Sequence, residues 1–319
     1  MLKFHLCFKD YPRILASCLV FPAFLNGCGQ SDKGVDGNSP GGSGFIVPGV
    51  GGSGANGGAG SGVWPPTGYA NVTNTTIGAY ALGPDISSGT VPANTGTGCS
   101  GLYGVVRDFK MGNQTGGHPD FETAPTQDVK GIVQNTLGTD GKPMYTTAGT
   151  PTGTSGAANF NQWYNDTPGV NMTYIVALQL VTSNGIATFS ASINNGGGLP
   201  DSSFFPLDGQ GFGNEGQNHN FSFTTEIHTS FTYKGGETFT FKGDDDVWVF
   251  INKQLVIDLG GRHGQETGQI ALDTLGLTAS TVYDLAVFHA ERHTTQSNFR
   301  IDTTLAFTNC GQINGVIIN

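Results

Sequence analysis

The chain has 319 residues, with 24 acidic against 14 basic side chains and a formal net charge of -10. This balance argues against a nucleic-acid partner, because binding to phosphates needs a basic surface. Beyond the N-terminal segment, no apolar run is long enough to cross a bilayer as a helix.

Residues 1–27 have the features of an export signal. Three basic residues precede an apolar stretch, 14–24, that is too short to span a bilayer. The segment ends in Leu-Asn-Gly before Cys28, which is similar to the lipobox of bacterial lipoproteins. We therefore expect Cys28 to be lipidated and the protein to be exported and anchored in the cell envelope, at the outer membrane or cell surface. An ordinary secretory signal with an incidental cysteine is the alternative.

Residues 28–98 are predicted to be a tether that does not fold on its own. Removal of the signal leaves 11 basic and 23 acidic residues, a net charge of -12. From Gly29 to Gly62, 14 of 34 residues are glycine, so this part cannot bury enough apolar area to form a core. As a flexible coil the tether spans roughly 40 to 50 Å. Its later part, 63–98, contains aromatic residues that we expect to pack partly on the domain.

Two cysteines remain in the mature body, Cys99 and Cys310. An exported chain lies in an oxidising compartment, where such a pair forms a disulfide. The bond would join the two ends of one domain, and two free thiols are the alternative. The pair therefore marks a domain over 99–310, followed by a tail, 311–319.

Within 99–310, short apolar segments separated by Gly, Asn and Asp clusters predict one all-β domain, a jelly-roll-like β-sandwich. Helical spacing over 127–138 predicts one short surface helix. The aromatic and aliphatic residues of 221–233 share one parity, which is typical of a strand with one buried face. Residues 247–251 are apolar on both faces and predict a central, doubly covered strand, and a tight hairpin turn is expected at Asn252-Lys253.

Three consecutive carboxylates, Asp244, Asp245 and Asp246, stand directly before that central strand. Adjacent negative charges repel one another, and their burial is costly unless a cation or dense hydrogen bonding compensates for it. Oxygen-only ligands at a loop suit calcium. A solvated acidic turn is the alternative.

Several long motifs resemble the fibro-slime domain, and their resemblance covers nearly all of 99–310. They are Arg107-Asp108-Phe109, His118-Pro119-Asp120-Phe121-Glu122, Phe205-Pro206-Leu207, His219-Asn220-Phe221, GDDDVWVFIN from Gly243, Asp258-Leu259-Gly260-Gly261 and FHAERHTTQSNFRIDT from Phe288. Fibro-slime domains occur in matrix and slime proteins of social amoebae and in bacterial surface proteins. They are similar to the wider protective-antigen-type β-sandwich, which includes the flocculin and adhesin lectins.

The resemblance implies a calcium site that helps to bind carbohydrate. In the related lectins two adjacent aspartates joined by a cis peptide hold the ion, and Asp244 and Asp245 match that pair. A second loop completes the shell with an amide oxygen and backbone carbonyls. Here Glu291 takes the place of the amide, and its added negative charge favours a bound metal over an open position for a sugar hydroxyl. The same interpretation makes Asp246, Arg292 and His293 ligand-binding residues, with Arg292 and His293 donating hydrogen bonds to a saccharide.

Competing chemistry is weaker. His289 and His293 lie roughly 13 Å apart along a straight strand, too far for one zinc ion. His263 follows the Gly260-Gly261 turn and is more simply a surface hydrogen-bonding residue than a metal ligand. No pair of carboxylates is fixed by any motif, so we expect no enzyme; turnover of a polysaccharide is the third hypothesis. A structural matrix protein without a metal site is the second, after calcium-dependent binding of a glycan or matrix polysaccharide.

Overall fold

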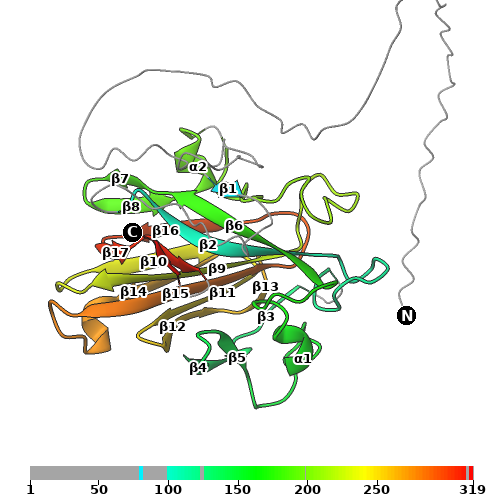
Figure 1. Ribbon diagram of the computed structural model, residues 1–319, viewed down its shortest axis with the longest axis horizontal. Helices are drawn as coiled ribbons and strands as arrows, with labels where there is room; N and C mark the ends of the chain where they lie inside the picture. The colour runs from blue at the N-terminus through cyan, green and yellow to red at the C-terminus, as the bar shows by residue number, and fades with distance from the viewer. Residues whose placement is uncertain (1–78, 82–98, 123–125, 198, 314–315, 319) are drawn as a thin grey trace, which may run out of the picture. The chain divides into compact units, whose positions relative to one another are not determined.

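The strands form two main antiparallel sheets (Figure 1). The computed structural model describes residues 79–81, 99–122, 126–197, 199–313 and 316–318. The ten-stranded sheet contains, in spatial order, β1 (Ala79–Ala81), β6 (Asn171–Gln179), β2 (Gly101–Phe109), β9 (Phe223–Thr232), β15 (Val282–Glu291), β11 (Asp246–Ile251), β12 (Gln254–Leu259), β4 (Val133–Leu137) and β5 (Pro143–Tyr145), with β17 (Phe307–Asn309) also pairing on β9. The five-stranded sheet contains β14 (Glu266–Ala271), β10 (Thr238–Gly243), β16 (Phe299–Thr303), β8 (Ile186–Phe189) and β7 (Val181–Ser183).

Short elements complete the domain. Two-residue strands β13 (Gly261–Arg262) and β3 (Gln127–Asp128) pair with each other, as do β18 (Gly311–Ile313) and β19 (Val316–Ile318). The helical elements described are α1 (Ala157–Phe160), α2 (Ala191–Asn194) and the 3-10 helix η2 (Leu272–Leu275). The prediction of an all-β sandwich is confirmed.

The central strand β11 separates two hydrophobic cores, as its sequence predicted. All six of its residues are buried. Val247 and Val249 face the first core, where the two sheets pack against each other with residues such as Phe241 of β10. Trp248 and Phe250 face the second core, in which the segment between β2 and β6 covers the outer face of the large sheet. Because both faces of β11 are covered, alternation between polar and apolar residues is absent from this strand.

The predicted turn at Asn252-Lys253 is also confirmed, since it joins β11 to β12 and both residues have positive φ, 50° and 64°. The predicted helix over 127–138 is wrong. This segment forms β3, a turn and β4, and Gly131 has φ of 78°, a conformation that ends a helix. Ile132 and Val133 are buried in the second core, so their apolar spacing reflects a strand after a turn.

Two short strands lie in segments that the sequence assigned to the tether and the tail. Residues Ala79–Ala81 of the expected tether pair with Val176–Leu178 of β6. In the expected tail, β18 and β19 form a hairpin, and β18 packs on β2 and β9. The export signal, Cys28 and most of the tether lie outside the described residues.

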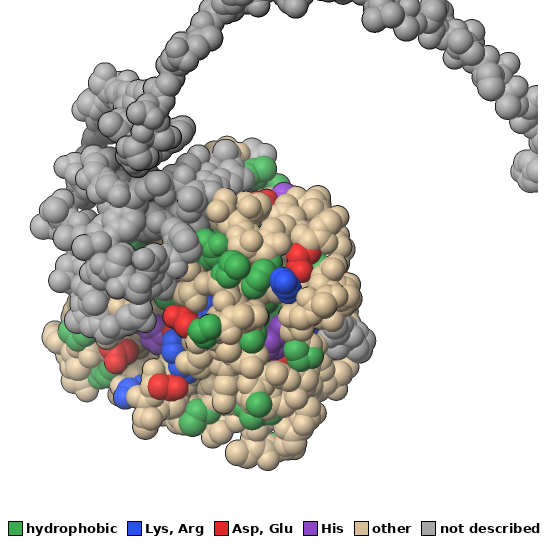
Figure 2. Space-filling view, turned by 45° about the vertical axis from the view of Figure 1, so that its right-hand side comes forward, with side chains coloured by type: hydrophobic (Ala, Val, Ile, Leu, Met, Phe, Trp, Pro, Cys, Tyr) green, Lys and Arg blue, Asp and Glu red, His purple; other side chains and the backbone are tan. Residues whose placement is uncertain are grey.

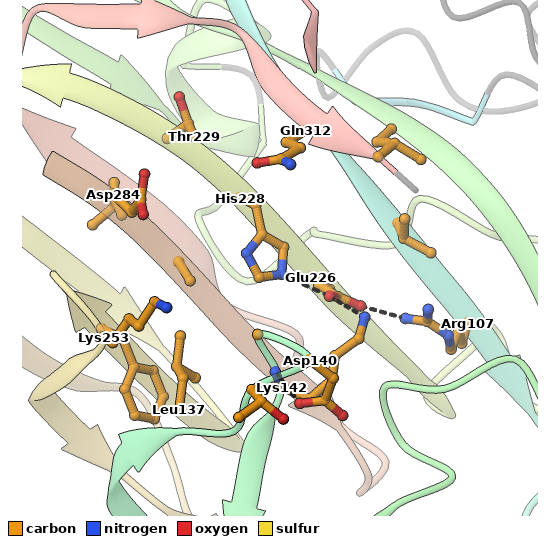
Figure 3. Close-up of a pocket in the computed structure, with 17 residues that line it drawn as sticks. Arg107, Leu137, Asp140, Lys142, Glu226, His228, Thr229, Lys253, Asp284 and Gln312 are labelled. Atoms are coloured by element: carbon orange, nitrogen blue, oxygen red, sulfur yellow. Dashed lines mark hydrogen bonds and ion pairs between the residues drawn. The ribbon is translucent and has the colours of Figure 1, made fainter. Parts of the chain in front are cut away.

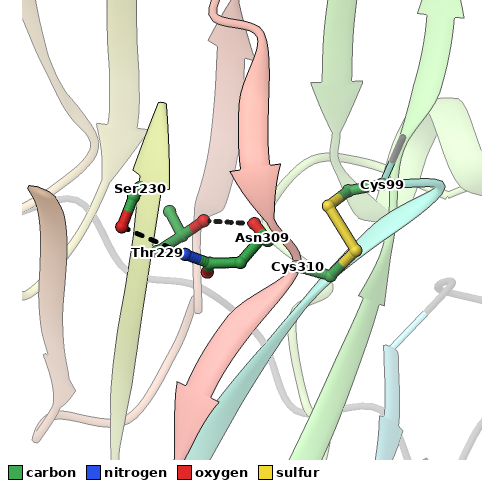
Figure 4. Close-up of a disulfide and its surroundings, with 5 residues drawn as sticks. All are labelled: Cys99, Thr229, Ser230, Asn309 and Cys310. Atoms are coloured by element: carbon green, nitrogen blue, oxygen red, sulfur yellow. Dashed lines mark hydrogen bonds between the residues drawn. A yellow bond between two sulfur atoms is a disulfide. The ribbon is translucent and has the colours of Figure 1, made fainter. Parts of the chain in front are cut away.

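The predicted disulfide joins Cys99 to Cys310, with their Cα atoms 5.2 Å apart (Figure 4). It connects the residues just before β2 and just after β17, which are 211 positions apart in the sequence. Cys310 is buried in a third apolar cluster with Tyr103, whose backbone N–H donates to the Cys310 carbonyl at 2.7 Å. The disulfide therefore links the two ends of the sandwich chain.

Candidate metal and ligand site

The acidic corner lies where the chain crosses from one sheet to the other. β10 ends at Gly243 in the small sheet and β11 begins at Asp246 in the large sheet, so Asp244 and Asp245 form the crossing. Asp246 pairs with Ala290 of β15, which places Glu291, the last residue of β15, beside the crossing. The Asp244–Asp245 peptide bond is cis, as the resemblance implies.

Both the side-chain carboxylate and the backbone carbonyl of Asp244 accept hydrogen bonds. Its two carboxylate oxygens accept from the backbone N–H of Asn298 at 2.5 Å and from the Asn298 side-chain amide at 2.7 Å. Its carbonyl accepts from His289 Nε2 at 2.7 Å. Because His289 is fully buried, burial lowers its pKa to about 4. His289 is thus a neutral, hydrogen-bonded core residue, which agrees with the rejection of a zinc site.

Asp245 and Glu291 are buried with less hydrogen bonding. Asp245 accepts from the backbone N–H of Arg292 at 2.9 Å. Glu291 is completely buried, and neither of its carboxylate oxygens has a hydrogen-bond partner with good geometry, although the Ser297 hydroxyl and the His293 N–H approach it. A buried carboxylate in this state is costly and calls for a compensating charge or a proton.

The cost of burial raises the pKa of all three carboxyl groups in the corner. Burial raises the pKa of Asp244 to about 6. Burial also raises the pKa of Asp245 well above its usual range, against the opposing effect of the Arg292 charge. For Glu291 burial again raises the pKa strongly, and the negative charges of Asp245 and Asp244 raise it further. The three carboxylates therefore interact as one crowded group.

Asp246 and Arg292 form a buried ion pair. Both side chains have 0% exposure, and Arg292 Nε and NH2 contact Asp246 Oδ2 at 2.6 Å each. Arg292 also donates to the carbonyls of Asp120 and Gly153, and its guanidinium lies 4.4 Å from the ring centre of Trp163. We predicted ligand contacts for both residues, and this must be corrected: their side chains are committed to the interior, where they position the loop.

His293 also interacts within the protein. Its Nδ1 atom lies 3.3 Å from Glu122 Oε2, and Glu122 accepts from both the backbone N–H and the hydroxyl of Thr294. The Glu122 N–H donates to the Arg292 carbonyl, so that carbonyl, one of those expected in a metal shell, already has a partner. Of the three predicted ligand-binding residues, Asp246, Arg292 and His293, only His293 has a partly exposed side chain.

A second group of potential ligands lies near the same end of the sandwich. This group contains Asp128, His263 and Glu266, whose potential ligand atoms all lie within 4.8 Å of one another. Among the described residues, no other group of three Asp, Glu, His or Cys side chains is this compact. Lys130 already bridges the two carboxylates at 3.0 and 2.9 Å. Both ring nitrogens of His263 face backbone carbonyls, so the histidine is a hydrogen-bonding residue here.

Sequence reasoning missed three residues that shape the acidic corner. Asn298 holds Asp244, Glu122 holds the loop after β15, and Trp163 covers the Arg292 guanidinium. Asn298 and Glu122 lie in motifs that the resemblance includes, but their partners are 54 and 172 positions away. Only the fold reveals such contacts.

On the face of the domain drawn in Figure 2, charged side chains are not concentrated in one patch. Lysine and arginine side chains on this face stand singly or beside acidic ones, and most of the face is uncharged. Among the residues that the structure describes, no helix is long and apolar enough to cross a bilayer. Neither feature bears on the lipid anchor predicted at Cys28.

Comparison with known proteins gives a domain match. Residues 206–319 match the PA14 domain model. Two curated proteins of Dictyostelium discoideum are similar to this chain. Protein psiQ is 42% identical over 203 residues, which cover 59% of this chain and 20% of psiQ. Protein psiD is 40% identical over 218 residues, which cover 64% of this chain and 40% of psiD. The chain thus spans less than half the length of these relatives.

Among solved structures, a β-glucosidase from Kluyveromyces marxianus in complex with glucose aligns with 29% of this chain and 11% of its own length. Its sequence identity is 14% and its TM-score is 0.19, too low to support any inference. The PA14 match, by contrast, supports a binding role, because PA14 is a carbohydrate-binding or adhesion-type domain. The match confirms the wider protective-antigen-type resemblance. The matched range, 206–319, includes Asp244, Asp245 and Glu291. The narrower fibro-slime resemblance stays a prediction.

Proposed function

We propose that this domain is a calcium-dependent carbohydrate-binding module of a cell-surface or matrix protein. Asp244, Asp245 and Glu291 would hold the ion through side-chain oxygens, which are the ligands that calcium prefers. The bound ion would supply two positive charges and coordination positions for a sugar hydroxyl.

The observation that carries this proposal is the Glu291 side chain. Its two oxygens are buried without a good hydrogen-bond partner, beside two further buried carboxylates. A divalent cation would attract all three carboxylates at once and offset two of their three charges, whereas protonation would have to neutralise each carboxylate separately. The ligand oxygens of these three residues do not all lie within 4.8 Å of one another. This spread is compatible with calcium, because ligands on opposite sides of the ion are about 5 Å apart.

The role of the other predicted residues follows from their contacts. The Arg292 side chain is fixed by Asp246, and its backbone N–H orients Asp245. His293, held by Glu122, is the residue that we propose to donate a hydrogen bond to a bound saccharide. The buried ion pair would thus hold the loop after β15 in place while His293 contacts the ligand.

Calorimetry of the full chain with calcium tests the metal site. We expect binding heat that is lost in Asp245→Asn and in Glu291→Gln, and retained in Asp128→Asn, a control at an exposed carboxylate. A wild-type protein that gives no heat and no change in melting temperature with millimolar calcium would contradict the metal site.

A glycan array, read with and without EDTA, tests the carbohydrate step. Binding that EDTA abolishes is the expected result. Calcium binding without any glycan signal would favour a structural matrix protein instead. We propose no turnover, and release of reducing sugar from an array ligand would contradict that part.

A further inference from the structure

A hollow lies on the outer face of the large sheet, away from the acidic corner. It has a volume of about 390 Å³, and strands β2, β9, β11 and β15 form its floor. The loop between β4 and β5 borders it on one side and β18 on the other, since Leu137, residues 139–142 and Gln312 line it. Its β11 and β15 residues, Phe250 and Ala286, lie about 14 to 17 Å along the strands from Asp246 and Glu291.

Glu226 of β9 lies at the centre of this hollow (Figure 3). Its side chain is 3% exposed, and its oxygens contact Arg107 NH1 and His228 Nε2 at 2.7 Å each and also the Lys142 ammonium. Burial alone would raise the pKa of Glu226, but the hydrogen bond from His228 and the charges of Arg107 and Lys142 hold it well below its usual range. The floor is therefore a fixed, charged and fully paired network rather than an apolar gap.

The rim carries polar groups that the protein leaves available. Among the described residues, the Lys253 ammonium and the Gln312 amide make no hydrogen bond or ion pair. Asp284 uses one oxygen to accept from Ser230 at 3.2 Å. Figure 3 shows Lys253 and Asp284 on one side of Glu226 and Arg107 on the opposite side. Donors and acceptors thus face one space from several directions.

The charges that line the hollow cancel. Three formally positive side chains, Arg107, Lys142 and Lys253, face three formally negative ones, Asp140, Glu226 and Asp284. A phosphate or another polyanion would meet three carboxylates, and a purely apolar molecule would bury charged groups without hydrogen bonds. A neutral ligand whose hydroxyl groups both donate and accept satisfies such a set of groups.

From this geometry we propose a second carbohydrate site, in which one neutral sugar unit binds in the hollow without calcium. Its hydroxyl groups bond with Lys253, Asp284, Lys142 and Gln312, and its apolar ring face lies against Leu137. The volume lies within the range of small-ligand pockets. A neighbouring hollow of about 340 Å³ shares Asp140 and Lys142, so a sugar chain can continue past Lys142. This site does not depend on the acidic corner.

Saturation-transfer NMR in EDTA tests the proposal on the full chain. The probes are glucose, galactose, mannose and N-acetylglucosamine, with glucuronate as the anionic comparison, each at millimolar concentration. The variants Lys253→Ala and Asp284→Asn change exposed rim residues, and Lys142→Met leaves Glu226 paired with Arg107 and His228. Lys234→Ala is the control at an exposed lysine outside the hollow.

We expect saturation transfer to at least one neutral sugar, and an apparent Kd raised about tenfold or more in the Lys253 and Asp284 variants. Lys234→Ala and Asp245→Asn should bind like the wild type, so failure of the calcium site would leave this result unchanged. The proposal is overturned by no transfer to any neutral sugar, by binding of glucuronate alone, or by rim variants that bind normally while circular dichroism shows them folded. Transfer that appears in calcium but not in EDTA would likewise overturn it.

Discussion

The buried carboxylate of Asp108 makes the stability of the domain depend on pH in an unusual direction. Asp108 lies on β2 with 0% exposure, and it accepts hydrogen bonds from the Phe212 N–H and the Asn220 amide at 2.5 and 2.7 Å. Burial outweighs these bonds and raises its pKa from 3.8 to about 7, with a further contribution from the Glu215 charge. The folded chain therefore holds a proton on Asp108 that the unfolded chain releases above pH of about 4.

The sign follows directly. Because the folded pKa is the higher one, the contribution of Asp108 to stability is complete below about pH 4 and is lost as pH rises through about 7. Linkage between these two pKa values gives a loss of about 2 kcal/mol in the free energy of unfolding between pH 5.5 and pH 8. An Asp108→Asn variant has nearly the same shape and does not titrate, so it lacks this loss.

The assay is urea unfolding of both proteins across this pH range, in EDTA, followed by tryptophan fluorescence, because Trp163 and Trp248 are fully buried. The difference between the two free energies removes the titrations that both proteins share. We expect wild type to gain about 2 kcal/mol relative to Asp108→Asn as pH falls from 8 to 5.5. Curves that stay parallel to within about 0.5 kcal/mol would refute the assignment of a raised pKa to Asp108.

Three further changes have definite expected outcomes. Replacing Cys99 and Cys310 with serine should lower the free energy of unfolding by about 5 kcal/mol, because the bond closes a very long loop; equal urea midpoints with and without reductant would argue against this. Arg292→Met should cost about 3 to 5 kcal/mol by leaving Asp246 charged and unpaired, and adding Asp246→Asn should restore part of that loss in the same measurement. Glu291→Gln should raise the melting temperature in EDTA, since it removes the cost of burying or protonating that carboxylate, and should abolish the further rise with calcium. A calcium-dependent rise that survives in Glu291→Gln would show that this carboxylate is not a ligand.

Much of the fold could be read from local pattern. The five apolar residues from Val247 predict a doubly covered strand because no polar face is left, and β11 separates two cores as expected. The shared parity of the apolar residues in 221–233 likewise predicted a buried face, and Phe223, Ile227 and Phe231 of β9 lie in the first core. The helix predicted over 127–138 was wrong because the spacing of apolar residues across a turn can match the period of a helix. The positive φ of Gly131 places a turn there instead.

The candidate site divides in the same way. The sequence by itself determined that Asp244, Asp245 and Asp246 are crowded, because neighbours in the chain repel one another wherever the chain lies. Only the tertiary structure decided which carboxylate turns inward to Arg292, because that pair joins β11 to the loop after β15. The network around Glu226 depends wholly on the fold, since Arg107 and Lys142 lie 119 and 84 positions from it and meet it through sheet pairing and the β4–β5 loop. Repulsion between neighbouring carboxylates follows from the sequence alone. Compensation of their buried charge depends on partners that are distant in the sequence and are brought close by the order of the strands in the sheets.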